Sequence, residues 1–275
     1  MTETINGHIL RLPHFKGRVH ANCDTPDFLE AISDCRCLLD SPQSEILLES
    51  RNRVGAVSLS LRGQEREDVI IKEFRSRGLA KWKNLLFPSK AFKAWQGAWA
   101  LVNRGIGTPL PLAYLERKKR GCLEENFFIA EKISTCREVR FLFRELSKDD
   151  LQRLLSALAH CLSFCHERGI FHRDLSDGNI LVKREAAGKF QFYFLDTNRI
   201  RLRKKIGVLG GIKNLVRLGV PPDDQLYFLA QYLKLEDVPI KFFVWYRINK
   251  SFYAGLVKLK KKLRLRKWAR QLRIQ

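Results

Sequence analysis

The stretch FHRDLSDGNILV, residues 171–182, decides how the rest of this 275-residue chain is interpreted. It places His172, Arg173 and Asp174 in a row, puts Asn179 five residues after the Asp, and then runs into apolar residues. A carboxylate can orient a reacting hydroxyl and an amide oxygen can bind a metal ion, so these residues could form a catalytic loop. Asp and Asn are also common in ordinary turns, so the flanking sequence has to separate a catalytic loop from a polar turn.

The residues before this stretch predict a small sheet-based lobe. Strand-like runs occur at residues 45–50, 56–62, 68–74, 106–119 and 125–133. Between the third and fourth runs, Pro88-Ser89 begins a helix whose apolar residues recur at helical spacing until Gly105. Residues 1–44 show no clear period, and we expect an irregular extension there, with one short helix at residues 26–35.

The second half of the chain has a helical character. Ser147 begins a helix with leucines along one stripe, which ends before Gly169. Two hairpin-like runs follow the opening stretch, and the C-terminal region is helical and very basic. We therefore expect three segments, namely an N-terminal extension at residues 1–44, a lobe at 45–133, and a second lobe at 134–275 that ends in a basic helix.

Two further residues complete a catalytic pattern. The run VIIK ends in Lys72 on the third predicted strand, and Asp196 follows the hairpin in the triplet Leu-Asp-Thr. With Asp174 and Asn179, and in this order, they resemble the catalytic residues of protein-kinase-like phosphotransferases. The resemblance implies an α+β, bilobal protein-kinase-like fold, with a small β-rich N-lobe carrying one main helix and a mostly helical C-lobe. It also implies ATP and magnesium (Mg2+) as cofactors.

Within that group the sequence most resembles the lipopolysaccharide core kinases, bacterial enzymes that phosphorylate Kdo or heptose in the inner core. The likeness rests on AWQGAWALVNRGIGTPLPLAYLERK, FFIAEKI and FHRDLSDGNILV, and on FLDTNRIR where protein kinases have Asp-Phe-Gly. It covers about residues 45–205. The resemblance implies an anionic, lipid-linked saccharide as the substrate.

The chemistry of phosphoryl transfer gives each matching residue a role, because the protein mainly positions the reactants and neutralises charge. We expect Lys72 to contact the α- and β-phosphates and Ile70, on the same strand face, to lie beneath the adenine. Asp174 is the candidate that accepts or orients the proton of the attacking hydroxyl. Asn179 and Asp196 are the candidate magnesium ligands.

The sequence patterns for the phosphate-side turn and the adenine-binding segment are weaker. The run SRNRVGAV has one Gly where protein kinases usually have three, so Gly55 with Arg51 and Arg53 is the candidate phosphate-side turn. The backbone around Glu131 and Ile133 is expected to pair with the adenine edge.

One departure concerns the usual partner of Lys72, a Glu from the first helix. From Phe74 to Leu115 the chain contains no Asp or Glu, and Ala94 stands where that Glu would be. Either Asp196 holds Lys72 directly, or nucleotide alone positions the lysine. A pseudokinase remains open at this stage.

Charge favours an anionic acceptor. The chain has 51 Lys and Arg against 29 Asp and Glu, and after Asp196 it runs into RIRLRKK without a long activation segment. Arginines can grip a phosphate or carboxylate through two hydrogen bonds. The candidate substrate-binding residues are Arg173, Arg199, Arg201 and Arg203. The alternative for these residues is an exposed, solvated face.

The C-terminus predicts contact with a membrane surface. From Lys258 onward there are nine Lys and Arg and no acid, with Leu259, Leu263 and Trp268 among them. Such a segment suits an anionic inner-membrane surface, and we favour this over nucleic acid, because an apolar stripe has no use on a duplex. The seven cysteines form neither a disulfide framework nor a zinc pattern. We expect a cytoplasmic protein, peripheral on the inner membrane.

Two other functions stay open. A small-molecule kinase of the antibiotic or choline type would share the catalytic residues and would have an acidic acceptor pocket. A non-catalytic adaptor on a kinase fold would bind nucleotide without transferring phosphate.

Overall fold

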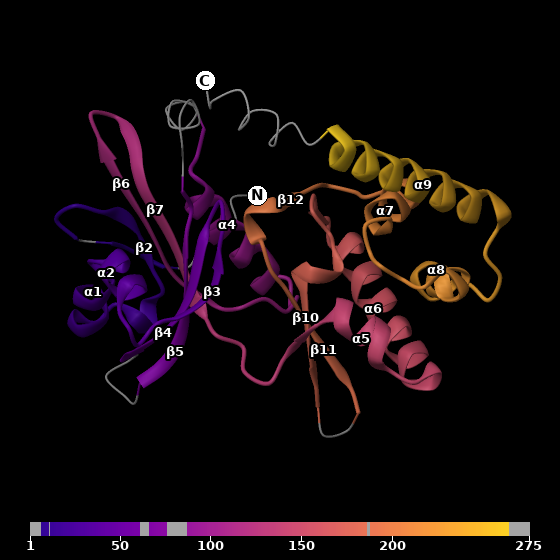
Figure 1. The fold of residues 1–275 in the computed structure, drawn as a ribbon, viewed down its shortest axis with the longest axis horizontal. Helices are drawn as coiled ribbons and strands as arrows, with labels where there is room; N and C mark the ends of the chain where they lie inside the picture. The colour runs from indigo at the N-terminus through magenta and orange to yellow at the C-terminus, as the bar shows by residue number, and fades with distance from the viewer. Residues whose placement is uncertain (1–6, 11, 61–65, 76–86, 186–187, 264–275) are drawn as a thin grey trace. The chain divides into compact units, whose positions relative to one another are not determined.

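The computed structural model describes residues 7–10, 12–60, 66–75, 87–185 and 188–263 (Figure 1). The chain divides into two compact units. The first comprises residues 1–137 with 180–202, and the second comprises residues 138–179 with 203–275. The mixture of helices and sheet agrees with the predicted α+β class.

The first unit is built on an antiparallel sheet of seven strands in the order β1-β2-β6-β7-β5-β4-β3 (Figure 1). Alternate side chains of these strands point to opposite faces, so each face has its own apolar cluster. The strands are β1 His8–Ile9, β2 Lys16–Val19, β3 Glu45–Glu49, β4 Arg53–Ser60, β5 Arg66–Glu73, β6 Pro111–Lys119 and β7 Cys122–Glu131. The last five confirm the five predicted strands.

One face of the sheet is covered by residues that we expected to be an irregular extension. Besides β1 and β2, they form η1 (Ala21–Cys23), α1 (Pro26–Ile32) and α2 (Cys35–Asp40). Phe28, Ile32 and Leu39 are buried in one cluster with the sheet. The expectation of an irregular segment was therefore wrong, because elements this short complete too few turns or alternations to show a period. The expected short helix at residues 26–35 corresponds to α1.

The other face carries α4 (Lys90–Val102), the main helix that the sequence predicts. Ser89 caps it by accepting a hydrogen bond from the N–H of Phe92 at 2.9 Å. Trp95 and Trp99 are buried and pack near Tyr114 of β6. This packing fixes α4 against the sheet face that also contains Phe74.

The first unit also contains a hairpin of β10 (Ile180–Arg184) and β11 (Phe190–Phe194), followed by η3 (Thr197–Arg199) and β12 (Ile200–Leu202). The segment before β6 fixes this hairpin: Gly107 accepts a bond from the N–H of Phe194 at 2.9 Å, and Thr108 Oγ1 donates to the carbonyl of Phe194 at 2.8 Å. A Cβ on Gly107 would collide with the carbonyl of Phe192. The motif Gly-Ile-Gly-Thr-Pro therefore sets where the chain leaves β11.

The second unit is mostly helical. Its longest buried stripe belongs to α6, where Ser147 accepts a hydrogen bond from the N–H of Asp150 and the predicted leucines are buried. The elements are β8 Arg137–Glu138 at the boundary, α5 Val139–Glu145, α6 Lys148–Glu167, β9 Ile170–His172, η2 Asp177–Asn179, α7 Val208–Leu215, η4 Pro222–Asp224, α8 Gln225–Leu233 and α9 Ile240–Leu263. In the part of the chain that the structure describes, no helix is long and apolar enough to cross a membrane.

Candidate active site

An ion pair between Lys72 and Asp196 forms the first part of the site. Lys72 lies on β5, on the sheet face that α4 covers, and its Nζ is 5.3 Å from the ring centroid of Phe74. The Nζ donates to Oδ1 of Asp196, and both side chains are partly buried. Of the two arrangements that the missing Glu left open, the structure therefore has the one in which Asp196 holds Lys72.

The local packing explains why α4 supplies no acid. Ala94 is buried, and its carbonyl accepts a hydrogen bond from Thr197 Oγ1 at 2.8 Å. One turn later, a Cβ on Gly97 would collide with the carbonyl of Thr197. The backbone of α4 thus lies directly against the residue that follows Asp196, and the buried Ala94 offers no carboxylate to Lys72.

Further cations surround the Lys72–Asp196 pair. Lys90, the first residue of α4, has its pKa lowered by burial and then by the positive charges of Arg199, Arg51 and Lys72. The N–H of Arg199 also donates to the carbonyl of Asp196 at 2.9 Å. A lysine at the positive end of a helix dipole costs stability unless an anion binds there. Sequence reasoning missed Lys90, although a helix that begins with Lys and lacks acid in its first turn is such a signal.

The second part of the site is the loop after β9. His172 is buried, and its Nδ1 accepts a hydrogen bond from the N–H of Asp174 at 3.1 Å, so His172 helps to hold the loop. Asn179 donates its Nδ2 to the carbonyl of Asp174 at 2.8 Å. This bond uses the amide nitrogen and not the amide oxygen, which is the atom that a magnesium ion would bind.

Sequence reasoning missed Arg217, which lies just after α7. Its Nη1 donates to Oδ1 of Asp174 and, at 3.2 Å, to the carbonyl of Arg173. Its Cζ is 5.0 Å from the ring centroid of Tyr253 on α9. The contact joins residues 43 apart in the sequence, so no local pattern could reveal it.

A buried polar network supports this loop from behind. Asn214 donates its Nδ2 to the carbonyl of His172 at 2.9 Å, and its Oδ1 is 3.0 Å from Nε2 of His166. The Nδ1 of His166 is 2.7 Å from the hydroxyl of Tyr232. Burial lowers the pKa of His166, so the neutral ring donates from Nε2 to Asn214 and accepts from Tyr232.

Two residues predicted for nucleotide binding have other roles in the structure. A Cβ on Gly55 would lie 2.7 Å from Leu39 Cδ2, so this glycine lets α2 pack closely against β4. The N–H of Glu131 donates to the carbonyl of Leu110 at 3.0 Å, so the group of Glu131 that would pair with adenine is its carbonyl. Binding of nucleotide by Gly55 and by the Glu131 backbone stays a prediction. Ile70 and Ile133 are partly buried, and their contact with adenine stays a prediction.

One of the two arginines of the predicted phosphate turn, Arg53, forms hydrogen bonds with α2. Arg53 donates to Oδ1 of Asp40 at 2.5 Å and to the carbonyl of Leu39 at 2.8 Å. It therefore ties β4 to α2.

The four candidate substrate arginines are divided between the two units. Arg199 and Arg201 belong to the first unit, and Arg173 and Arg203 to the second. Arg199 neighbours Asp196, whereas Arg203 stacks over Phe171 at 4.1 Å from the ring centroid. The packing of Arg203 gives it a structural contact, and binding of an acceptor by all four arginines stays a prediction.

The donor atoms fit a magnesium ion. Asp196 offers a carboxylate and Asn179 an amide oxygen, both hard ligands that Mg2+ prefers, and magnesium in phosphotransferases takes most other ligands from phosphates and water. Among the described residues, no group of three or more His, Cys, Asp or Glu is placed to hold a metal.

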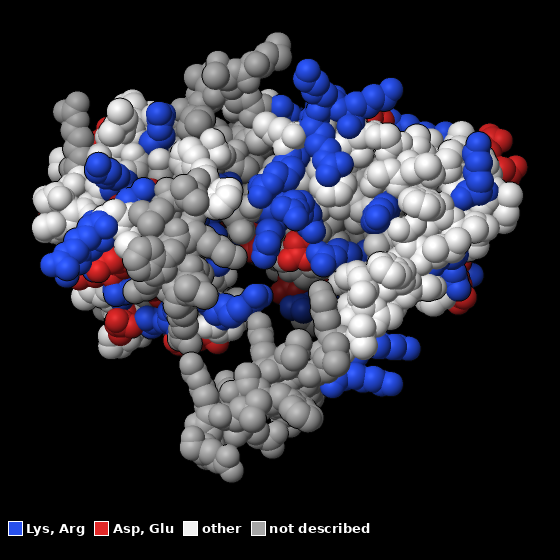
Figure 2. All heavy atoms as spheres, turned by 90° about the horizontal axis from the view of Figure 1, so that it is seen from above, with Lys and Arg blue, Asp and Glu red and all other residues white. Residues whose placement is uncertain are grey.

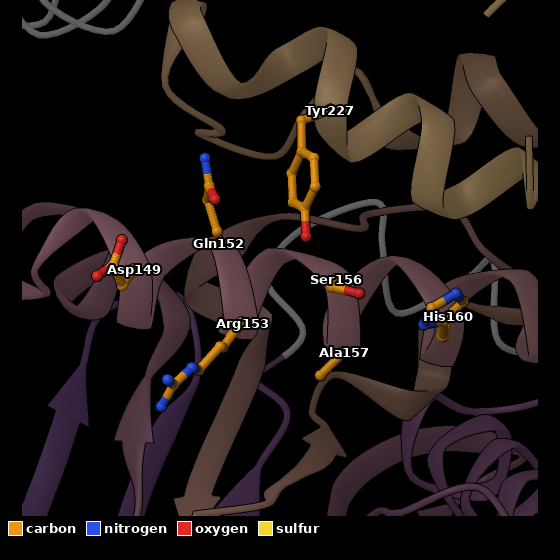
Figure 3. A pocket seen from close by; sticks show the side chains of 7 residues that line it. All are labelled: Asp149, Gln152, Arg153, Ser156, Ala157, His160 and Tyr227. Atoms are coloured by element: carbon orange, nitrogen blue, oxygen red, sulfur yellow. The ribbon is translucent and has the colours of Figure 1, made fainter. Parts of the chain in front are cut away.

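A surface hollow in the second unit lies apart from these residues. It is formed by α6 and α8 and includes Arg153, His160 and Tyr227 (Figure 3). None of the residues lining it belongs to the predicted site, and it contributes nothing to the candidate chemistry.

Comparison with known proteins agrees with the resemblance seen in the sequence. The profile of the lipopolysaccharide kinase (Kdo/WaaP) family matches residues 76–219, more than half of the chain, and this range includes Asp174, Asn179, Asp196 and Arg217. A solved structure described as "WaaP in complex with acyl carrier protein" is similar with a TM-score of 0.53 and 20% identity. The similarity covers 80% of this chain and 89% of that chain, and at this identity it shows a shared fold.

Proposed function

Because the chain belongs to the lipopolysaccharide kinase (Kdo/WaaP) family, we propose that it transfers the γ-phosphoryl group of ATP to a sugar hydroxyl of the lipopolysaccharide inner core. The acceptor sugar is Kdo or heptose. The observation that carries the proposal is the pairing of Lys72 with Asp196 in a chain that also holds Asp174 and Asn179 in one ordered loop.

The proposed reaction needs the two units to act as the lobes of a kinase, with Lys72, Asp174, Asn179 and Asp196 converging on one cleft. Lys72 neutralises the α- and β-phosphates, and Asp196 and Asn179 would hold a magnesium ion, which would supply positive charge to the phosphates. Asp174 orients the acceptor hydroxyl and accepts its proton as the oxygen bonds to the γ-phosphorus and the bond from that phosphorus to the leaving ADP breaks. Lys90 and Arg199 add positive charge near Asp196, where phosphate oxygens would lie.

The proposed acceptor is an anionic, lipid-linked saccharide at the cytoplasmic face of the inner membrane. Its phosphates or carboxylates would meet Arg173, Arg199 and Arg201, which are chemically suited to such groups. The cationic balance of the whole chain favours an anionic surface and disfavours the acidic acceptor pocket of antibiotic or choline kinases.

Incubation with labelled ATP, magnesium and a panel of acceptors tests the proposal. The panel contains inner-core precursors that end in Kdo, precursors that end in heptose, an aminoglycoside and choline. We expect label on one class of core precursor and on neither small molecule. Label on an aminoglycoside or choline would replace the proposal by the small-molecule alternative, and nucleotide binding without transfer to any acceptor would favour the adaptor.

Arg217 is expected to position Asp174 during this reaction. Replacing Arg217 with Ala should lower kcat by about tenfold, equivalent to ~1.4 kcal/mol, because a charge-assisted hydrogen bond to Asp174 is lost. The KM for ATP should change little, since the contacts of Arg217 are with the loop and with Tyr253 and not with the predicted nucleotide-binding residues. Steady-state kinetics of Arg217→Ala and Arg217→Lys check this, and Lys213→Ala, an exposed cation on α7, is the matched control. A kcat equal to that of the control would remove Arg217 from this role.

A further inference from the structure

The last helix, α9, presents a stripe of large apolar side chains to solvent. They recur mainly at intervals of four residues and remain on the outward side over most of the 24-residue helix. The exposed fractions are 74% for Ile240, 45% for Val244, 59% for Ile248, 67% for Phe252 and 51% for Leu259. An exposed apolar surface of this extent is uncommon on a protein that remains free in solution, and it marks an interaction site.

The opposite side of α9 anchors the helix to its own unit, so the stripe is not needed for folding. Tyr246 is fully buried, and Trp245 donates its Nε1 to the carbonyl of Leu209 on α7 at 3.0 Å. Lys250 donates its Nζ to the carbonyl of Leu218 at 2.7 Å. The helix is thus held in one orientation, with the apolar stripe facing outward.

Cations border the stripe, and acids are absent from this part of the sequence. Lys241, Arg247, Lys258 and Lys262 are exposed on α9, and the sequence contains no Asp or Glu after Asp237. Figure 2, which views the molecule from above, shows a broad surface of uncharged residues with Lys and Arg around it and a few Asp and Glu at its outer edge. An apolar strip with a basic rim is complementary to a surface that has anionic head groups above hydrocarbon.

We infer that the outward face of α9, from Ile240 to Leu259, binds in the plane of an anionic lipid surface. The apolar side chains enter the boundary between head groups and acyl chains, and the bordering cations contact the lipid phosphates. This places the apolar contact upstream of the basic tail that the sequence indicated. Of that tail, Leu263 and Trp268 fall outside the side chains that the structure describes.

The inference rests on the proposed function in one respect: a lipid-linked acceptor gives the protein a reason to bind a membrane surface. The contact between Tyr253 and Arg217 connects α9 to the loop that carries Asp174. Two contacts within the same unit, from Tyr253 to Arg217 and from Arg217 to Asp174, therefore connect the helix that carries the stripe to the proposed acceptor site.

Sedimentation with vesicles tests the inference on the full chain. The double variant Ile248→Ser/Phe252→Ser should bind vesicles of phosphatidylcholine with phosphatidylglycerol about tenfold more weakly than the wild type, because two inserted side chains are lost. The matched control is Leu226→Ser/Leu235→Ser, two exposed apolar residues elsewhere in the same unit, which should bind as the wild type does. Wild-type binding should also fall with salt and on pure phosphatidylcholine.

Equal vesicle binding by the wild type and both variants would overturn the inference. So would a wild type that does not sediment with anionic vesicles, a result that would assign the stripe to a protein partner. Phosphotransfer to a deacylated, water-soluble acceptor separates lipid binding from the proposed activity. The rate with this acceptor should be the same for Ile248→Ser/Phe252→Ser as for the wild type, because this acceptor is not in a membrane. The wild type could also bind vesicles through α9 and transfer no phosphate to any acceptor. That result would reject the proposed function and would leave the inference that α9 binds lipid intact.

Discussion

Replacing Asp174 with Ala is expected to lower phosphotransfer by about 100-fold to 10,000-fold, the usual contribution of a general acid or base. The reason is that this carboxylate acts on the acceptor hydroxyl. Its place is set by the bond from its N–H to His172, and its side chain is held by Arg217. Nucleotide affinity should stay close to that of the wild type, because the predicted nucleotide contacts come from other residues.

The matched control for Asp174→Ala is Asp177→Ala in the same loop. Asp177 begins η2, and an Asp at such a position commonly caps a turn through backbone hydrogen bonds, so its loss should affect stability more than turnover. Single-turnover kinetics with saturating ATP measure the chemical step for both variants, and titration with ATP measures binding. Normal turnover by Asp174→Ala would remove Asp174 from the proposed role.

Replacing Asp196 with Ala is expected to weaken binding of magnesium and ATP by about 10-fold to 100-fold and to reduce turnover as well. This carboxylate has two tasks in the proposed site: it holds Lys72, and it binds the metal. Kinases that hold their lysine with a helix Glu divide these tasks between two acids. Because α4 contains no Asp or Glu, the loss of Asp196 should not be compensated.

Isothermal titration with ATP, with and without magnesium, checks the role of Asp196. Lys72→Met should weaken ATP binding in both conditions, whereas Asp196→Ala should have its larger effect when magnesium is present. Asp68→Ala is the control, since Asp68 also lies on β5 and pairs with a lysine, Lys132, at 3.1 Å. An Asp196→Ala variant that binds magnesium and ATP as tightly as this control would contradict the assignment.

The sequence predicted the parts of the fold in which a local pattern is long enough to read. The strands around Lys72, the helix that begins after Ser89 and the helix that begins after Ser147 all have clear periods and capping residues. The spacing of Asp174 and Asn179 also reports local geometry, because the hydrogen bond between them spans five residues.

The features of the site that the sequence did not predict depend on contacts between residues that are far apart in the sequence. The choice between Asp196 and nucleotide as the partner of Lys72 is decided by the course of the chain after β11. The role of Arg217 depends on where α7 ends, and the requirement for Gly55 depends on the packing of α2. The short elements of residues 8–40 gain their stability from burial against the sheet, so their own sequences carry little periodic signal.

The most direct test of the proposed activity is mass spectrometry of the lipopolysaccharide core after reaction with ATP and magnesium, with the wild type and Asp174→Ala compared side by side. The expected result is one added phosphate on a fragment that contains only Kdo or heptose, with the wild type and not with the variant. A core that gains no phosphate while ATP is consumed, or an added phosphate that Asp174→Ala produces equally well, would contradict the proposed function of this chain.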